Sequence, residues 1–118
     1  MIIGIGTDIV QISRIKKAME KSHFSKKCFT DREQIQANNL MASFAGYFAA
    51  KEAVAKALGT GFRGFGLLDI EVVKDEFGKP SICLYNQAKQ RSKELGVTNI
   101  LVSISHEKEY AIAYVIIE

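Results

Sequence analysis

The sequence lacks the features that mark zinc-binding, secreted or membrane-spanning proteins. Its 118 residues include only two cysteines, Cys28 and Cys83, which form no metal-type spacing and are typical of a reducing cytoplasm. No apolar run approaches the length that crosses a bilayer, and the N-terminus enters a strand pattern directly, so we expect neither a membrane helix nor a signal peptide. Repeats, linkers and low-complexity segments are also missing. We therefore expect one soluble cytoplasmic domain covering residues 1–118.

Three common functional signatures are incomplete. The formal net charge of +3 is mild, and no basic stretch is interleaved with aromatic residues in the manner of a nucleic-acid motif. Gly4 and Gly6 begin a dinucleotide-binding fingerprint, but Ile9 stands where its third glycine is required. Ser105 lies next to His106, but it lacks the flanking glycines that expose the nucleophile of a hydrolase. We expect no nucleic acid partner, no dinucleotide-binding fold and no serine hydrolase.

The most informative segment that is present is rich in alanine and carries charge. Its alanine, leucine, lysine and glutamate residues predict a helix from about Ala42 to Leu58, which ends at Gly59. Apolar residues at three- to seven-residue intervals give this helix a core-facing stripe, and its alanines allow another element to approach closely. Glu52 is therefore expected on a rigid element near the packed interior.

Glu52 and Lys56 are four residues apart and share one face of this predicted helix. The simplest interpretation is an exposed ion pair, which supports a helix by about 0.2–0.5 kcal/mol. This helix carries one acid, Glu52, and two bases, Lys51 and Lys56, and it ends at glycines. That combination also suits an acidic, phosphate-bearing ligand. The local sequence leaves both interpretations open.

Strand patterns lie at the two ends of the chain. The β-branched run over residues 1–10 predicts a strand that ends near Asp8. Asp8 is expected to face a ligand, to cap a helix that runs through Arg14 to Met19, or to do both. Residues 100–106 and 110–117 predict a β-hairpin with His106 at its turn. A lone histidine there is more often a surface or capping residue than a functional one.

The remaining patterns complete an α+β domain. Thr30 and Glu33 have the spacing of a capping box, which predicts the start of a helix. Two strands, over residues 69–74 and 80–85, and a helix over residues 86–95 give the order β, α, α, α, β, β, α, β, β. The last strand is apolar on both faces, which a small domain rarely buries within one subunit, so we expect an oligomer.

Three motifs together resemble one enzyme family. They read GIGTDI at residues 4–9, FAAKEAVAKALGTG at residues 48–61 and VSISH at residues 102–106. In this order and spacing the chain is similar, over nearly its whole length, to bacterial holo-[acyl-carrier-protein] synthases, the short 4′-phosphopantetheinyl transferases. The resemblance implies the 4′-phosphopantetheinyl transferase fold, with a small antiparallel sheet packed against a long helix and a homotrimer formed through the sheet.

The resemblance also implies a reaction. The 4′-phosphopantetheine group of coenzyme A is transferred to a serine of an apo acyl carrier protein in fatty acid biosynthesis, and 3′,5′-ADP is released. By similarity, Asp8 and Glu52 coordinate Mg²⁺ with the pyrophosphate and water, and one of them accepts the serine proton. Lys56 is implied as the cation at the leaving diphosphate. Coenzyme contacts are implied for Lys56, Gly59, Thr60, Gly61 and His106.

Two further positions concern binding. Arg14 matches the family, and the basic run that it begins, with Lys16, Lys17 and Lys21, is either a solvated helix face or a surface for an acidic carrier protein. Tyr47 stands where relatives usually have an arginine, so one phosphate contact is expected to be missing or replaced by the phenol. The alternative function is a non-catalytic carrier-protein or nucleotide-binding module of the same fold.

Overall fold

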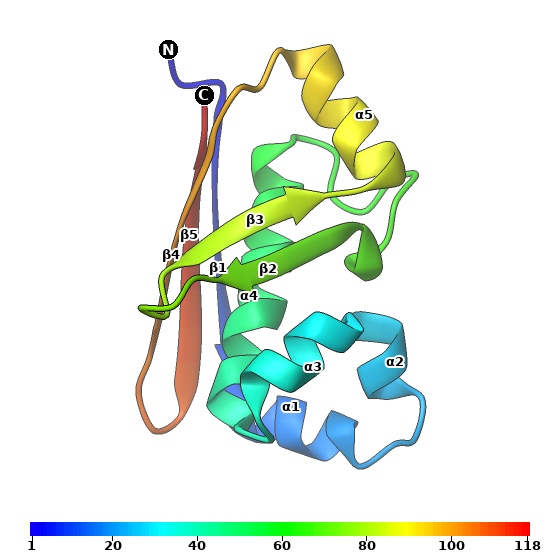
Figure 1. The fold of residues 1–118 in the computed structure, drawn as a ribbon, viewed down its shortest axis with the longest axis vertical. Helices are drawn as coiled ribbons and strands as arrows, with labels where there is room; N and C mark the ends of the chain where they lie inside the picture. Colours follow the sequence, from blue (N-terminus) through cyan, green and yellow to red (C-terminus); the bar gives the residue numbers. More distant parts are fainter.

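One long helix organises the computed structural model, which describes residues 1–118 (Figure 1). The helix, α4 (Met41–Ala57), packs against an antiparallel sheet of three strands. That sheet has the order β1 (Gly4–Gln11), β5 (Tyr110–Ile117), β4 (Ile100–His106). The predicted α+β architecture, an antiparallel sheet against a long helix, is confirmed, and so is the C-terminal hairpin.

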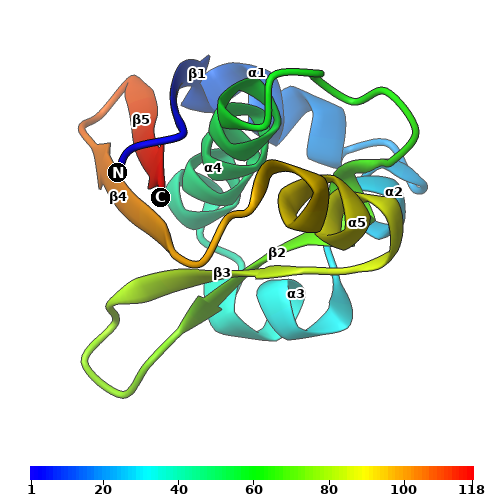
Figure 2. The ribbon, with the colours of Figure 1, turned by 90° about the horizontal axis from the view of Figure 1, so that it is seen from above.

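The other elements surround α4 on its remaining sides, as Figure 2 shows. A second antiparallel sheet pairs β2 (Ile70–Lys74) with β3 (Pro80–Leu84) and follows a 3₁₀ turn, η1 (Leu67–Asp69). The shorter helices are α1 (Ile12–Met19), α2 (Phe24–Cys28), α3 (Asp31–Ala37) and α5 (Asn86–Leu95). None of the helices has the length and apolar character needed to cross a membrane.

Small residues let β1 lie directly against α4. A Cβ atom added to Gly6 would overlap the carbonyl oxygen of Ala53, and one added to Gly4 would overlap that of Ala57. The two glycines that begin an incomplete dinucleotide fingerprint therefore serve close packing between strand and helix. This contact fixes the position of the next β1 residue on the same face, Asp8.

The two faces of β5 have different surroundings. Ala111, Ala113, Val115 and Ile117 are fully buried against the core, whereas Tyr110, Ile112 and Tyr114 are 41%, 40% and 53% exposed. The exposed face continues onto β1 and β4 through Ile5, Ile9 and Leu101. A single chain thus leaves an apolar sheet face uncovered, as the pattern of the last strand predicted.

Two sequence expectations need correction. Asp8 does not cap the first helix, because it lies inside β1 and the N-cap of α1 is Gln11. The structure also has four helices between β1 and β2 instead of three, because the five-residue α2 was not predicted. This helix has no side-chain cap and no acidic residue in its first turn, and it is held by packing of Phe24 and Phe29. The predicted capping box of α3 is confirmed by both of its hydrogen bonds.

Candidate functional site

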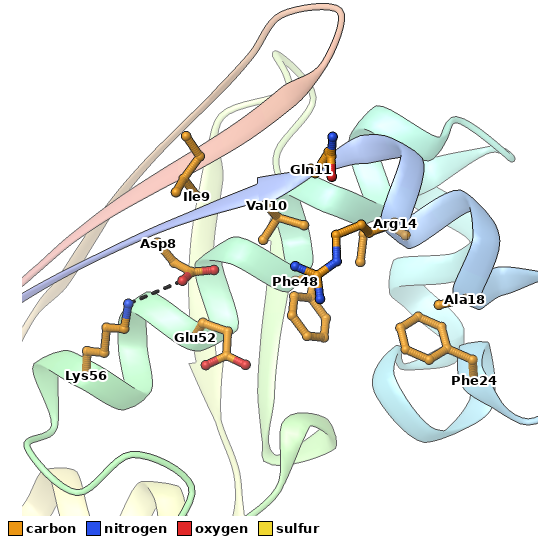
Figure 3. Close-up of a pocket in the computed structure, with 11 residues that line it drawn as sticks. Asp8, Ile9, Val10, Gln11, Arg14, Ala18, Phe24, Phe48, Glu52 and Lys56 are labelled. Carbon is orange, nitrogen blue, oxygen red and sulfur yellow. Dashed lines mark hydrogen bonds and ion pairs between the residues drawn. The ribbon is translucent and has the colours of Figure 1, made fainter.

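Asp8, Glu52 and Lys56 line one cavity of about 510 Å³ between β1, α1 and α4 (Figure 3). Asp8 pairs with Ala113, whose side chain is buried, so Asp8 lies on the face of β1 that meets α4. Glu52 and Lys56 follow each other by one turn of α4. The fold therefore brings Asp8 of the first motif to Glu52 and Lys56 of the second, which lie more than 40 residues further along the chain.

Lys56 pairs with Asp8 and not with Glu52. Its Nζ donates to Asp8 Oδ1 at 3.2 Å and to the carbonyl oxygen of Thr7 at 2.9 Å. The exposed Glu52–Lys56 ion pair, the simplest interpretation of the sequence, is not formed. The Lys56 side chain is 54% exposed, and such a pair contributes about 0–1 kcal/mol to stability. Lys56 is therefore held loosely enough to turn toward a ligand.

The carboxylate of Glu52 has no hydrogen-bond or ion-pair partner and faces the same cavity. Partial burial raises its pKa, the negative charge of Asp8 raises it further, and the positive charge of Lys56 opposes the shift. Two acids thus face the cavity with only one cation bonded to them. A bound cation would relieve this repulsion.

The donor set of the cavity fits Mg²⁺. No group of three or more His, Cys, Asp or Glu side chains is placed to hold a metal ion. Mg²⁺ commonly binds proteins through one or two carboxylates and takes its other ligands from water and substrate phosphates. Asp8 and Glu52, two carboxylates facing one open cavity, supply that number.

The far end of the cavity is lined by Arg14 of α1 together with Phe24 and Phe48 (Figure 3). Arg14 is exposed, and Lys16 and Lys17 are exposed beside it on α1. Lys21 lies beyond the end of this helix. Phe24 and Phe48 stack with their ring centroids 6.4 Å apart. The sequence patterns did not single out these two rings as cavity residues, although Phe48 precedes Glu52 by one helical turn.

Residues 59–61 close α4 and do not line this cavity. Gly59 and Gly61 have positive φ angles of 83° and 62°. Their N–H groups donate to the carbonyl oxygens of Lys56 and Ala55. The predicted glycine C-cap is confirmed, and among the three residues only Thr60 has a backbone N–H without a backbone acceptor.

His106 lines a separate cavity of about 180 Å³ on the opposite flank of α4, with Tyr47 and Lys74 among its neighbours. Tyr47 is only 1% exposed, and its hydroxyl has no hydrogen-bond partner. Burial raises the pKa of this phenol. Within one chain, His106 and the Asp8 cavity are not brought together.

Lys51, one of the two bases that suggested a phosphate-bearing ligand, does not line the cavity and is fully buried. Its Nζ contacts Glu33 Oε1 at 2.7 Å and donates to the carbonyl oxygens of Leu67 and Ile70 at 2.9 and 2.7 Å. Burial lowers the pKa of Lys51, and the charge of Glu33 opposes that shift. This ion pair joins α3 and α4 to the segment that starts the second sheet.

Comparison with known proteins identifies the family. The model of the 4′-phosphopantetheinyl transferase superfamily matches residues 4–115. The chain belongs to this superfamily. A holo-[acyl-carrier-protein] synthase from Clostridium novyi (strain NT) is 52% identical over 122 residues, with 100% of this chain and 88% of that relative covered.

Solved structures agree with this assignment. The holo-[acyl-carrier-protein] synthase of Neisseria meningitidis superposes with a TM-score of 0.91 at 35% identity, covering 100% of this chain and 99% of that one. The Helicobacter pylori holo-[acyl-carrier-protein] synthase, solved in complex with coenzyme A, gives a TM-score of 0.87 at 34% identity, covering 97% and 99%. The site described above therefore lies in a phosphopantetheinyl transferase with the fold of these synthases.

Proposed function

We propose that this phosphopantetheinyl transferase moves the 4′-phosphopantetheine group of coenzyme A to a serine of an apo acyl carrier protein, releasing 3′,5′-ADP, in fatty acid biosynthesis. The observation that carries this proposal is the convergence of Asp8, Glu52 and Lys56 on one cavity. The names of the Clostridium novyi relative and of the Helicobacter pylori complex support the two substrates.

Asp8 and Glu52 would hold Mg²⁺ together with the pyrophosphate of coenzyme A and water. This metal site is supported by the carboxylate of Glu52, which has no partner and lies near the carboxylate of Asp8. When bound, such an ion neutralises phosphate charge and orients the phosphoryl group for in-line attack.

Side chains of the cavity stabilise the leaving group and accept the serine proton. Lys56 leaves its exposed contact with Asp8 and stabilises the leaving diphosphate oxygen. Either Glu52 or Asp8, directly or through water, accepts the proton of the attacking serine. Glu52 is favoured, because Asp8 already accepts a hydrogen bond from Lys56 while the Glu52 carboxylate has no partner.

Arg14, exposed at the far end of the cavity, would meet the acidic surface of the carrier protein. The coenzyme would also contact residues 59–61 and His106. Because His106 lies outside the Asp8 cavity, we propose that His106 of the partner subunit completes the site in a homotrimer formed through the exposed face of the three-stranded sheet. The free Cys28 and Cys83 are consistent with a cytoplasmic enzyme.

Mass spectrometry of the carrier protein tests the activity. Purified protein, coenzyme A, Mg²⁺ and apo carrier protein are expected to give a carrier heavier by one phosphopantetheine arm, and Asp8→Ala or Glu52→Ala should lose this product. Binding of coenzyme A without any mass gain, at every Mg²⁺ concentration, would identify a non-catalytic module instead. Sedimentation that shows only a fully active monomer would exclude a site shared between subunits.

A further inference from the structure

The helix α5 bonds to both ends of the loop that follows α4 (Figure 1). Where the loop begins, Arg91 Nε donates to the carbonyl oxygen of Leu58 at 3.1 Å. Where it ends, Asn86 Nδ2 donates to Asp69 Oδ1 at 2.8 Å. The loop of residues 59–66 therefore lies between two attachments to the same helix.

The loop itself contains few bonds that would fix its shape. Three of its glycines have positive φ angles of 83°, 62° and 82°: Gly59, Gly61 and Gly64. Glycine adopts such angles easily, but it also has the largest choice of other conformations. Only the N–H groups of Gly59, Gly61 and Gly66 donate to a protein acceptor. Ordering this loop costs conformational entropy, so its two attachments govern how often it has the shape described here.

The attachment through Arg91 completes the end of α4. Leu58 is the C-cap of this helix, and the last carbonyl groups of a helix lack partners within it. Arg91 supplies a donor there, and its positive charge suits the negative end of the helix. A Cβ atom added to Gly59 would lie 3.6 Å from Arg91 Nη2, so the guanidinium also packs against the first loop residue.

The attachment through Asn86 runs by way of one carboxylate. Asp69 accepts from the Asn86 amide at Oδ1 and from the N–H of Gly66, the last loop residue, at Oδ2. The N–H of Tyr85 donates to the carbonyl oxygen of Asp69 at 2.8 Å. Asn86 has a φ angle of 52°, which asparagine tolerates better than most residues. Asp69 thus joins the start of α5 to the end of the loop.

The loop borders the candidate site. Phe62 and Gly66 line a second cavity, of about 430 Å³, together with Glu52. Residues 59–61 are those for which the proposed function includes contacts with coenzyme A. A change in the shape of the loop would therefore alter the surroundings of Glu52 and of the coenzyme.

We propose that α5 holds the 59–66 loop in its binding shape, with Arg91 and Asn86 as positioning residues for coenzyme A. This inference rests on the proposed function. Neither residue lines the Asp8 cavity, so both act through the loop. If the loop has its binding shape for only a fraction of the time, the apparent affinity for the coenzyme falls by that fraction.

Steady-state kinetics separate this role from one in the chemical step. Arg91→Met removes the donors and keeps an apolar stem, whereas Asn86→Gly removes the amide and accepts the positive φ. The KM for coenzyme A should rise about tenfold in Arg91→Met and about threefold in Asn86→Gly, with kcat and the KM for the carrier protein changed less than about twofold. Arg91→Lys restores a donor and should recover most of the wild-type KM. Gln90→Met, at an exposed position of α5, is the matched control.

Limited digestion with trypsin measures the loop without any ligand. Arg63 is exposed within the loop and is a site for trypsin. Cleavage after Arg63 should be about tenfold faster in Arg91→Met and about threefold faster in Asn86→Gly than in the wild type. Rates are divided by the rate of cleavage after Lys21, which is exposed between α1 and α2, to correct for global unfolding.

Three results would overturn the inference. An active wild type with an unchanged KM for coenzyme A in Arg91→Met would show that binding does not need the attachment. A lower kcat at an unchanged KM would place the effect in the chemical step. Equal cleavage after Arg63 in all proteins would show that α5 does not hold the loop. A wild type that fails to modify the carrier would instead refute the proposed function, and the trypsin rates would still test the attachment.

Discussion

Two lysines of α4 differ sharply in their surroundings. Lys51 is fully buried and bonds to Glu33 and two backbone carbonyls, so its charge is completely engaged. Lys56, little more than one turn later, is 54% exposed and bonds only to Asp8 and the carbonyl of Thr7. A buried lysine whose partners all lie inside the protein stabilises the fold. An exposed lysine can leave its partners and bind a ligand instead.

The buried Lys51–Glu33 pair also helps to orient the cavity residues of α4. Glu33 receives hydrogen bonds from the N–H groups of Thr30 and Val72 as well as the charge of Lys51, so α3, α4 and β2 meet at one point. With Lys51 fixed on the packed side of α4, the next residue, Glu52, turns toward the cavities. The geometry of the site therefore depends on an ion pair that does not enter it.

Breaking the buried pair should have the largest effect. Lys51→Met leaves Glu33 charged and buried without its cation, which costs about 3–5 kcal/mol of stability. Urea unfolding measures this loss. Lys56→Met is the matched control and should change stability by less than about 1 kcal/mol. Similar losses for the two variants would show that burial does not distinguish the two lysines.

Removing the exposed lysine should chiefly affect catalysis. Lys56→Met is expected to lower the rate of carrier modification by about 10²–10³-fold, because a cation is lost where charge develops on the leaving diphosphate. Rates are measured at saturating coenzyme A by mass spectrometry of the carrier. Lys93→Met, on the exposed surface of α5, is the control and should keep the wild-type rate. An unchanged rate in Lys56→Met would remove the lysine from the proposed mechanism.

The packing between β1 and α4 sets the distance from Asp8 on the strand to Glu52 on the helix. Gly6→Ala places a methyl group against the carbonyl oxygen of Ala53, and such overpacking costs about 1–3 kcal/mol. It should also push Asp8 away from Glu52, so carrier modification should fall even at temperatures where the variant is folded. Thermal unfolding and rates on the same sample test both effects. A fully active variant would show that the site tolerates this shift.

Local signals in the sequence predicted most elements of the fold. The α4 helix, the capping box at Thr30 and the two hairpins follow residue propensities and spacings, and the structure confirms them. The short α2 was missed because tertiary packing of Phe24 and Phe29 holds it without a cap. Local spacing suggested Glu52 as the partner of Lys56, but the pair forms with Asp8, which only the crossing of β1 over α4 brings near. Partners distant in sequence are set by packing and not by local pattern.

The smallest expected effect concerns Glu71, whose contribution to stability should depend on pH. Glu71 is 5% exposed, and burial by itself would raise its pKa. Hydrogen bonds from Thr30 and Tyr85, together with the positive charges of Arg32 and Lys51, outweigh burial and lower the pKa. Because the folded pKa lies below the unfolded value of about 4.3, this stabilisation is present above that pH and is lost as pH falls through the folded pKa.

Glu71→Gln should therefore be less stable than wild type by about 1 kcal/mol at neutral pH, since a hydrogen-bonded charge is removed. The difference should shrink as the pH falls below about 4.3, because wild-type Glu71 then becomes protonated. Thermal unfolding of both proteins across this range measures it. The Asp8–Lys56 pair should respond to salt instead, because it is exposed and screened. A difference that stays constant with pH would mean that the hydrogen bonds, and not the charge of Glu71, carry the stabilisation.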